Sequence, residues 1–268
     1  LGYAEGFKGG MRMALHDVNN DGQSDIILGP NKGGGPHVRI FTKGGDLLGQ
    51  FFAYDPKFRG GVEVAGGDVD GDGFADIVVT PGPGHEPLVR IYDMQGNLKN
   101  EFLAYGRTQQ GGVHVSVGDI DQDGIDDIVT SPYSGSSEVF IYDFSGVMKG
   151  QFKVHQKGKK AVHIAVADVT GDFIPEIVAS DLAGTEPRIY IFTAQGDLLH
   201  SFLAYAPGLR TGLRIAIGDI NQDGMNDIIA SPSKGGGPHV RIFNYLGELQ
   251  SQFFAGDSKF RGGIFVDF

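Results

Sequence analysis

Short apolar runs, rather than long amphipathic stretches, dominate this chain. Between residues 62 and 105 four such runs follow one another, each four or five residues long and rich in Val, Ile, Phe and Tyr. Gly, Pro, Asn and Asp separate them, which is typical of strands and turns, and no window keeps the 3.6-residue period of a helix. The predicted strands are Val62–Gly66, Ile77–Thr80, Leu88–Tyr92 and Glu101–Tyr105.

The same succession recurs with a period of about 50 residues. An acidic loop marks each copy: Asp68-Val-Asp70-Gly-Asp72-Gly73-Phe-Ala-Asp76 has counterparts that begin at Asp17, Asp119, Asp168 and Asp219. A period of this length indicates stacked or radial units. Tight turns between the third and fourth runs, such as Met94–Asn97, indicate hairpins and weigh against an all-parallel solenoid.

Four antiparallel strands in each unit of about 50 residues are typical of a propeller blade. We therefore predict an all-β fold, a β-propeller of four-stranded antiparallel blades, as a single domain over residues 1–268 with five repeats visible. Because the chain begins and ends inside repeats, a larger ring or a continuing array is the alternative. The expected blades are approximately 9–60, 61–111, 112–160, 161–211 and 212–262, with an extra inner strand at 263–268.

The acidic loop has the composition of a calcium site. Oxygen ligands at positions 1, 3 and 5, a carbonyl from position 7 and a carboxylate at position 9 supply the hard oxygens that Ca²⁺ prefers. Gly at position 6 permits the sharp turn. An EF-hand is excluded, because position 12 is never Glu and the flanking segments are β. The predicted ligands are Asp17, Asn19, Asp21, Gln23 and Asp25; Asp68, Asp70, Asp72, Phe74 and Asp76; Asp119, Asp121, Asp123, Ile125 and Asp127; and Asp219, Asn221, Asp223, Met225 and Asp227.

The loop that begins at Asp168 departs from this pattern. Phe173 stands where the turn requires Gly, Thr170 replaces Asp or Asn, and Glu176 replaces the last Asp. We therefore expect four calcium ions and leave open whether Asp168, Thr170, Asp172 and Glu176 hold a fifth, weaker one.

Charge and composition exclude several functions. The 33 acidic against 22 basic residues give a net charge of −11, which argues against nucleic acid as partner. About half of these acids lie in the five loops, so bound calcium would neutralise much of the charge. No run approaches the length of a membrane-spanning segment, and the absence of Cys excludes disulfides and thiolate metal sites.

The loops and the strands around them resemble a known family. A strand such as Val115-Ser-Val117-Gly118-Asp119 leads into each loop, and a small-residue–Pro turn such as Thr80-Pro81 or Ser231-Pro232 follows it. This pattern is similar to the FG-GAP or VCBS repeats of integrin α-subunit propellers and of bacterial secreted proteins. The resemblance implies a calcium-stabilised propeller used for binding or adhesion.

Two sets of residues are candidates for binding a partner. The strand order places the metal loops and hairpin turns at one face and the other connections at the opposite face. That second face carries two near copies of Lys-Gly-Gly-Gly-Pro-His and of Phe-Arg-Gly-Gly, whose alternative interpretation is turn glycines with solvated side chains. The candidates there are Lys32, His37, Arg59, Lys234, His239 and Arg261.

The second set lies on the innermost strands. Their aligned polar positions are Arg12, Glu63, His114, His163 and Arg214. His114 and His163 are candidates for binding a carboxylate or a sugar, unless these side chains satisfy one another between blades. In the third strands Arg39, Arg90 and Arg241 align with Phe140 and Tyr190, which indicates packing between blades.

The motifs of familiar enzymes are missing: the chain has no Gly-x-Ser-x-Gly, no His-Glu-x-x-His and no Cys nucleophile. The sequence and the resemblance together predict a calcium-stabilised, non-catalytic binding or adhesion module, extracellular or at the cell surface. Its protein or glycan ligand is expected on the face opposite the calcium loops. The alternatives are a carbohydrate-binding propeller lectin and, less favoured, a polysaccharide lyase or hydrolase.

Overall fold

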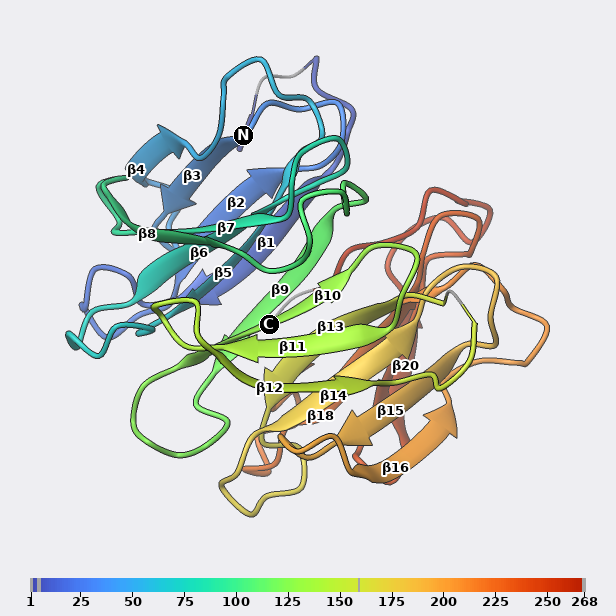
Figure 1. The fold of residues 1–268 in the computed structure, drawn as a ribbon. Helices are drawn as coiled ribbons and strands as arrows, with labels where there is room; N and C mark the ends of the chain where they lie inside the picture. Colours follow the sequence, from blue (N-terminus) through green and yellow to red (C-terminus); the bar gives the residue numbers. More distant parts are fainter. Residues whose placement is uncertain (1, 4–5, 159, 267–268) are drawn as a thin grey trace. The chain divides into compact units, whose positions relative to one another are not determined.

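The regular structure of the chain consists of β-strands. A computed structural model describes residues 2–3, 6–158 and 160–266, and over these ranges it contains twenty strands and no helix (Figure 1). The strands form five four-stranded antiparallel sheets, each built from consecutive strands in sequence order. The predicted all-β class and the five four-stranded propeller blades are therefore confirmed.

Each blade has strands of five or six residues. The first blade contains β1 (Met11–His16), β2 (Asp25–Pro30), β3 (His37–Phe41) and β4 (Leu47–Phe52). The second contains β5 (Val62–Gly67), β6 (Asp76–Pro81), β7 (Leu88–Tyr92) and β8 (Leu98–Leu103). The third contains β9 (Val113–Gly118), β10 (Asp127–Pro132), β11 (Glu138–Tyr142) and β12 (Met148–Lys153). The fourth contains β13 (Val162–Ala167), β14 (Glu176–Asp181), β15 (Arg188–Phe192) and β16 (Leu198–Leu203), and the fifth β17 (Leu213–Gly218), β18 (Asp227–Pro232), β19 (His239–Phe243) and β20 (Leu249–Phe254).

Burial changes systematically from strand to strand within a blade. The second strands β6, β10, β14 and β18 are buried at every position, whereas the fourth strand β20 is exposed at every position. A strand covered on both faces reads as a continuous apolar run, because neither side meets water. This explains why Ile77–Thr80 is so clear in the sequence.

The contacts divide the chain into two compact units, whose boundary runs through the third sheet. The first unit comprises residues 1–119, 123–132 and 140–149, and the second comprises 120–122, 133–139 and 150–268. In the first unit β5 lies beside both β1 and β9, and in the second β13 lies beside β17. Within each unit the innermost strands of successive blades are thus neighbours.

Side chains at the end of the fourth strand fasten blade one to blade two and blade four to blade five. The hydroxyl of Tyr54, just after β4, lies 2.9 Å from the carbonyl oxygen of Val79 and 2.6 Å from that of Leu88 in blade two. In return, Arg90 Nη1 donates to the carbonyl oxygen of Ala53 at 2.8 Å. Equivalent bonds in the second unit join Tyr205 to Ala230 and His239, and Arg241 to Ala204. The predicted packing role of Arg90 and Arg241 is consistent with these contacts.

Two predicted strands differ from the structure by more than one residue at an end. The fourth strand of blade two is Leu98–Leu103 rather than Glu101–Tyr105, since it begins directly after the hairpin and its partly exposed first half has no apolar run. Residues 263–266 form no assigned strand. Ile264 nevertheless accepts a bond from Ser231 Oγ at 3.1 Å, and residues 267–268 lie outside the described residues.

Substitution of the blade-fastening tyrosine tests this packing. Tyr54→Phe removes a buried hydroxyl and leaves two buried carbonyl groups without their donor, so we expect a loss of about 1–3 kcal/mol in the free energy of unfolding. Tyr245→Phe is the matched control, because that half-buried ring also packs against a hydrophobic core and its hydroxyl makes no hydrogen bond within the described residues. Denaturant unfolding in the same buffer measures both, and equal losses would contradict the proposed role of Tyr54.

Candidate functional site

The backbone of each acidic loop is shaped by its own aspartates. In the second loop the Asp68 carboxylate accepts the amides of Asp72 and Gly73 at 3.1 and 2.9 Å. The Asp72 carboxylate in turn accepts the amide of Phe74 at 2.9 Å through Oδ1. The same three bonds recur in the loops that begin at Asp17, Asp119 and Asp219. The carboxylates of positions 1 and 5 are therefore held toward the inside of the loop.

Position 6 requires a left-handed backbone. Gly73 has φ 84°, and the corresponding glycines of the other complete loops have closely similar values. Phe173 occupies this position with φ 69° and leaves 86 % of its surface exposed. Because residues other than Gly are strained in this region, the fourth loop keeps the turn only at a local energetic cost.

The last aspartate of the loop is buried and incompletely satisfied. Asp25, Asp76 and Asp227 are at most 4 % exposed, and Oδ2 of each accepts no hydrogen bond. Burial raises the pKa of Asp25 and Asp227, and raises that of Asp76 to about 6. A buried carboxylate oxygen without a donor is costly, and a cation in the loop would satisfy it. These residues fit calcium.

In the fourth loop, hydrogen-bond donors of the protein itself satisfy the last carboxylate, that of Glu176. Glu176 Oε2 accepts the amides of Val169 and Thr170 at 2.9 and 3.3 Å, and Oε1 accepts the Thr170 hydroxyl at 3.0 Å. Asp168, Asp172 and Glu176 do gather ligand atoms within 4.8 Å of one another, as Asp68, Asp70 and Asp76 do in the second loop. The Thr170–Glu176 pair nevertheless leaves that carboxylate satisfied by protein donors alone.

The residues predicted for the opposite face form two similar arrangements, one in each unit. In the first unit the amide of Gly33 donates to the carbonyl oxygen of Arg59 at 2.8 Å, which joins the loops of Lys32 and Arg59. The ring of His37 stacks on Phe52 with centroids 4.7 Å apart. In the second unit the same contacts join Gly235 to Arg261 and His239 to Phe254, beside Lys234.

The lysines and arginines of this face differ in whether the protein itself holds their side chains. Lys32 and Lys234 are exposed. Arg59 Nη1 instead donates to the carbonyl oxygens of Pro56 and Phe58 in its own loop, at 2.5 and 2.9 Å, and Arg261 does the same with Ser258 and Phe260. The two arginines therefore brace their loops as well as carrying charge.

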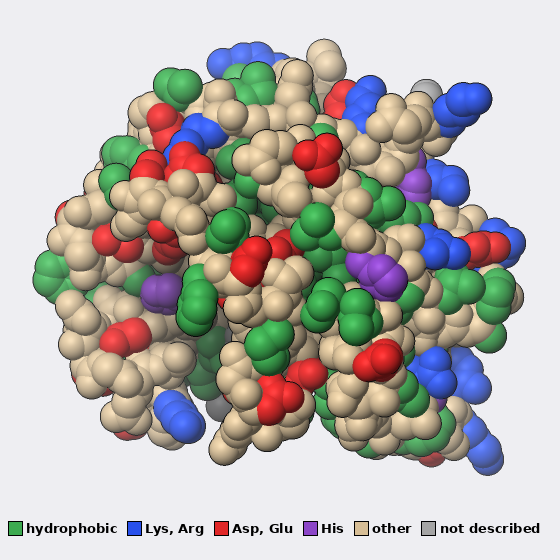
Figure 2. All heavy atoms as spheres, turned by 90° about the horizontal axis from the view of Figure 1, so that it is seen from below, with side chains coloured by type: hydrophobic (Ala, Val, Ile, Leu, Met, Phe, Trp, Pro, Cys, Tyr) green, Lys and Arg blue, Asp and Glu red, His purple; other side chains and the backbone are tan. Residues whose placement is uncertain are grey.

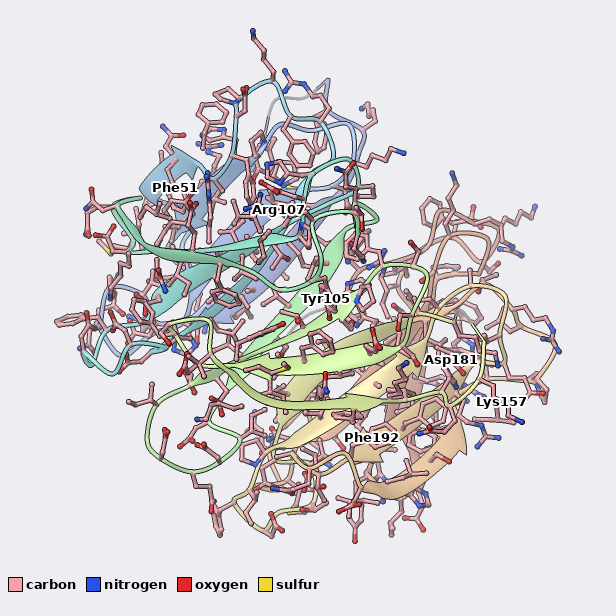
Figure 3. All side chains as sticks on the ribbon, viewed as in Figure 1. Phe51, Tyr105, Arg107, Lys157, Asp181 and Phe192 are labelled. Atoms are coloured by element: carbon pink, nitrogen blue, oxygen red, sulfur yellow. The ribbon has the colours of Figure 1, made fainter. Side chains whose placement is uncertain are left out.

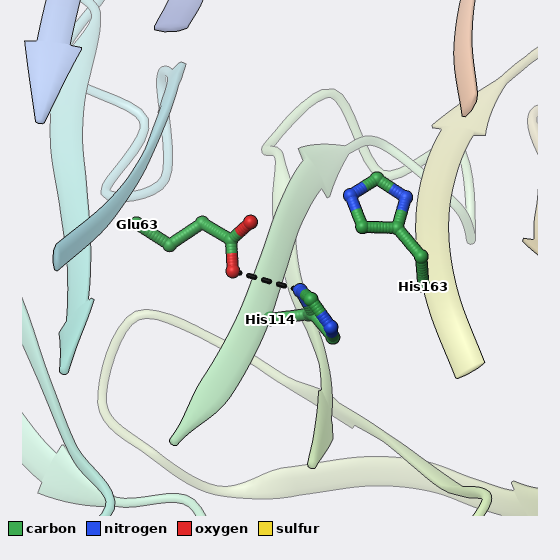
Figure 4. A group of neighbouring side chains, drawn as sticks. All are labelled: Glu63, His114 and His163. Carbon is green, nitrogen blue, oxygen red and sulfur yellow. Dashed lines mark hydrogen bonds and ion pairs between the residues drawn. The ribbon is translucent and has the colours of Figure 1, made fainter. Parts of the chain in front are cut away.

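On the inner strands the described contacts are internal. His114 Nδ1 lies 2.8 Å from Glu63 Oε2 (Figure 4). Arg12 Nη1 lies 3.0 Å from Glu63 Oε1, and all three side chains are buried. In the second unit His163 is half-buried on β13, and Arg214 lies over the ring of Phe265 at 3.8 Å. Arg12, Glu63 and His114 thus match the alternative of mutual satisfaction, and ligand binding by His114 and His163 stays a prediction.

A family model for FG-GAP-like repeats matches residues 17–79, 68–130 and 119–179, together more than half of the chain. The chain belongs to the FG-GAP-like repeat family. Each match begins at the first aspartate of one loop and ends within the second strand of the next blade. The matched repeat therefore has the acidic loop at both of its ends, which are the segments described above.

Solved structures share the fold of this FG-GAP protein at low identity. A lectin from Agrocybe aegerita that recognises non-reducing terminal N-acetylglucosamine aligns at 19% identity and a TM-score of 0.52, covering 92% of this chain and 66% of the lectin. The V. cholerae biofilm matrix protein Bap1 aligns at 19% identity with a TM-score of 0.51, and the alignment covers 92% of this chain and 39% of Bap1. A Bacteroides caccae protein of unknown function aligns at 12% identity with a TM-score of 0.59, and the alignment covers 92% of this chain and 83% of that protein. The chain thus spans less than two thirds of the lectin and about two fifths of Bap1, and these likenesses concern the fold alone.

Sequence reasoning missed two lysines that enter the FG-GAP loops. Lys99 on β8 contacts Asp70, Asp72 and Asp76, and Lys149 on β12 contacts Asp123 and Asp127. The sequence does mark these two lysines as equivalent, because each stands three residues after the hairpin glycine of its blade.

A cluster around the buried Asp181 of blade four was also missed. Asp181, labelled in Figure 3, pairs with His155 Nε2 at 2.6 Å and accepts the Tyr190 hydroxyl at 3.1 Å. Desolvation raises the pKa of the Tyr190 hydroxyl. The other four blades have Pro at the position of Asp181, so this departure from the repeat was the available signal.

Hollows lie beside the acidic loops in both units. The first unit has one of about 390 Å³, lined by Asp72, Asp76 and Lys99 among others. The second unit has one of about 610 Å³, where Asp121 and Thr170 lie near apolar side chains such as Leu199. Acidic side chains form several separate groups on the face seen in Figure 2, which agrees with charge concentrated locally.

The buried last aspartate of the first loop can be tested directly. In metal-free buffer at pH 7, Asp25→Asn removes a buried charge, so we expect the variant to melt no lower than the wild type. In calcium the wild type should gain stability and the variant should gain clearly less. Thermal unfolding with EGTA and then with calcium measures both effects, with Asp46→Asn in the exposed hairpin as control. An equal calcium gain in Asp25→Asn and the wild type would show that Asp25 is not a ligand.

Proposed function

We propose that this chain is a calcium-stabilised, non-catalytic binding module. The observation that carries the proposal is the buried, unsatisfied oxygen at the ninth position of the loops that begin at Asp17, Asp68 and Asp219. Family membership and the fold shared with a lectin and a matrix protein support a binding role.

Calcium would act by binding the folded loops in preference to the unfolded chain. Such binding adds RT ln(1 + [Ca²⁺]/Kd) to the free energy of unfolding. With a Kd of about 10⁻⁴–10⁻³ M, as in extracellular calcium modules, each loop contributes roughly 1–2 kcal/mol at a few millimolar calcium. Several calcium-bound loops together would contribute an amount comparable to the whole free energy of unfolding of a typical domain. Because such weak sites fill only where calcium is abundant, we propose an extracellular or cell-surface location.

We propose that the partner binds the face opposite the calcium loops. The connections β2–β3 and β18–β19, together with the segments that follow β4 and β20, carry the two arrangements with Lys32 and Lys234. Exposed cations beside stacked aromatic rings suit an acidic protein surface or a glycan. Membrane crossing by a helix has no support, since no helix long and apolar enough occurs in the described ranges.

A glycan partner is favoured by the aromatic rings on this face. Phe52, Phe254 and Phe260 are at least half exposed, and exposed rings provide flat surfaces for the apolar faces of sugars. The Agrocybe aegerita lectin shares the fold. A carbohydrate-binding role is therefore the more specific form of the proposal, and an acidic protein partner is the alternative.

Two matched variants test the calcium role. Asp223 and Asp172 stand at position 5 of the fifth and fourth loops, and each accepts one backbone amide at 2.9 Å. Replacing either with Ala thus removes the same internal bond. We expect chelation by EGTA to lower the melting temperature of the wild type markedly and Asp223→Ala to lose part of that calcium dependence. Asp172→Ala should keep it fully, and identical behaviour of the two variants would refute the assignment.

Charge reversal tests the proposed ligand face. Wild-type protein should bind acidic members of an immobilised panel of acidic and neutral glycans, and Lys32→Glu with Lys234→Glu should weaken binding of the acidic members about tenfold or more, since each substitution reverses a local charge. Lys43→Glu in the hairpin at the metal-loop end is the control. Unchanged binding by the Lys32/Lys234 variant, with the control also unchanged, would place the ligand elsewhere.

A further inference from the structure

A lysine ammonium occupies the carboxylate cage of the second loop. Lys99 Nζ lies 2.8 Å from Asp72 Oδ2 and 2.8 Å from Asp76 Oδ1, and it also contacts Asp70 Oδ2. These three aspartates are the side chains at positions 3, 5 and 9 that calcium would take. The Lys99 side chain is only 21 % exposed, so it lies within the loop rather than in solvent.

The third loop has the same arrangement. Lys149 Nζ lies 2.8 Å from Asp127 Oδ1 and 3.2 Å from Asp123 Oδ2, again the aspartates at positions 9 and 5. Lys149 stands at the same place on β12 as Lys99 does on β8, the second residue of the strand. The recurrence of the contact in two blades follows from one repeated sequence position.

The other blades lack a cation at this position. It holds Leu48 in the first blade, Leu199 in the fourth and Gln250 in the fifth. Leu48 packs against the hydrophobic core, and the Gln250 amide donates to the carbonyl oxygen of Glu248 at 3.3 Å. The loops that begin at Asp17 and Asp219 therefore have no internal ammonium from the following hairpin.

The lysines accompany an additional acid in their loops. Position 3 is Asp70 and Asp121 in the two loops with a lysine, but Asn19 and Asn221 in the complete loops without one. The extra negative charge and the extra positive charge thus occur together. Within this one chain, the lysine is matched to the loop that it enters.

We propose that Lys99 and Lys149 are internal cations that compete with calcium for the second and third loops. This inference rests on the proposed calcium role. An ammonium and a calcium ion cannot both lie among the same three carboxylates, because calcium binds carboxylate oxygens at about 2.3–2.6 Å and the two cations repel at that range. The lysines neutralise these loops when calcium is absent and must leave when it binds. The loops at Asp17 and Asp219 therefore fill first.

The double variant Lys99→Gln/Lys149→Gln tests the competition with calcium alone as the probe. Calorimetric titration of the wild type should resolve two tighter and two weaker sites. In the variant the weaker class should tighten on the order of tenfold, or about 1.4 kcal/mol, because calcium no longer has to displace an ammonium. In EGTA the same variant should melt at a lower temperature, because its empty loops lose their counter-charge.

Two further variants make the result specific. Lys153→Gln removes an ion pair with Glu138 from the same strand as Lys149, and it should leave calcium affinity unchanged. Gln250→Lys places an ammonium at the corresponding exposed position of the fifth blade, and it should weaken one of the two tighter sites. Both results support competition by the lysine in its loop.

The outcomes separate this inference from the calcium role itself. If the lysine variant binds calcium as weakly as the wild type or more weakly, the competition is refuted while the calcium role stands. If neither protein binds calcium at any loop, the calcium role fails and the competition fails with it.

Discussion

The structure depends on a buried carboxylate that the protein leaves incompletely satisfied. Each complete loop ends on an aspartate that begins a fully or largely buried second strand. Moving it into solvent would pull that strand out of the blade, so the charge stays inside, where we propose that a calcium ion compensates it. The loop, the strand and the proposed metal site are consequently one feature of the sequence.

This constraint also explains how the fourth loop differs. There the longer Glu176 reaches back to two amides and the Thr170 hydroxyl, so the start of β14 is anchored by hydrogen bonds. Phe173 accepts a strained backbone and projects into solvent. One blade can thus do without the ion proposed for the others because its replacements act together, and Thr170→Val or Glu176→Asp alone would leave a carboxylate without one or more of these donors.

Much of the fold was predictable from sequence because burial and turn chemistry repeat with the blade. Ile77–Val79 is apolar throughout since both faces of its strand are covered, whereas the start of Leu98–Leu103 was missed because a partly exposed outer strand needs no apolar pattern. The predicted ligand positions follow from loop spacing alone, and their role as calcium ligands stays a prediction. The positions of Lys99 and Lys149 do not follow from this spacing, because the contact depends on how a hairpin folds back over a loop about 27 residues earlier in the chain.

The most direct test of the account is an anomalous difference map from crystals grown in millimolar calcium. We expect peaks in the loops that begin at Asp17, Asp68, Asp119 and Asp219, each bound by the buried aspartate at position 9, and no comparable peak beside Glu176. Loops at Asp17 and Asp219 that hold only water around Asp25 and Asp227 would contradict the central claim, since the buried oxygens would then be satisfied without a metal.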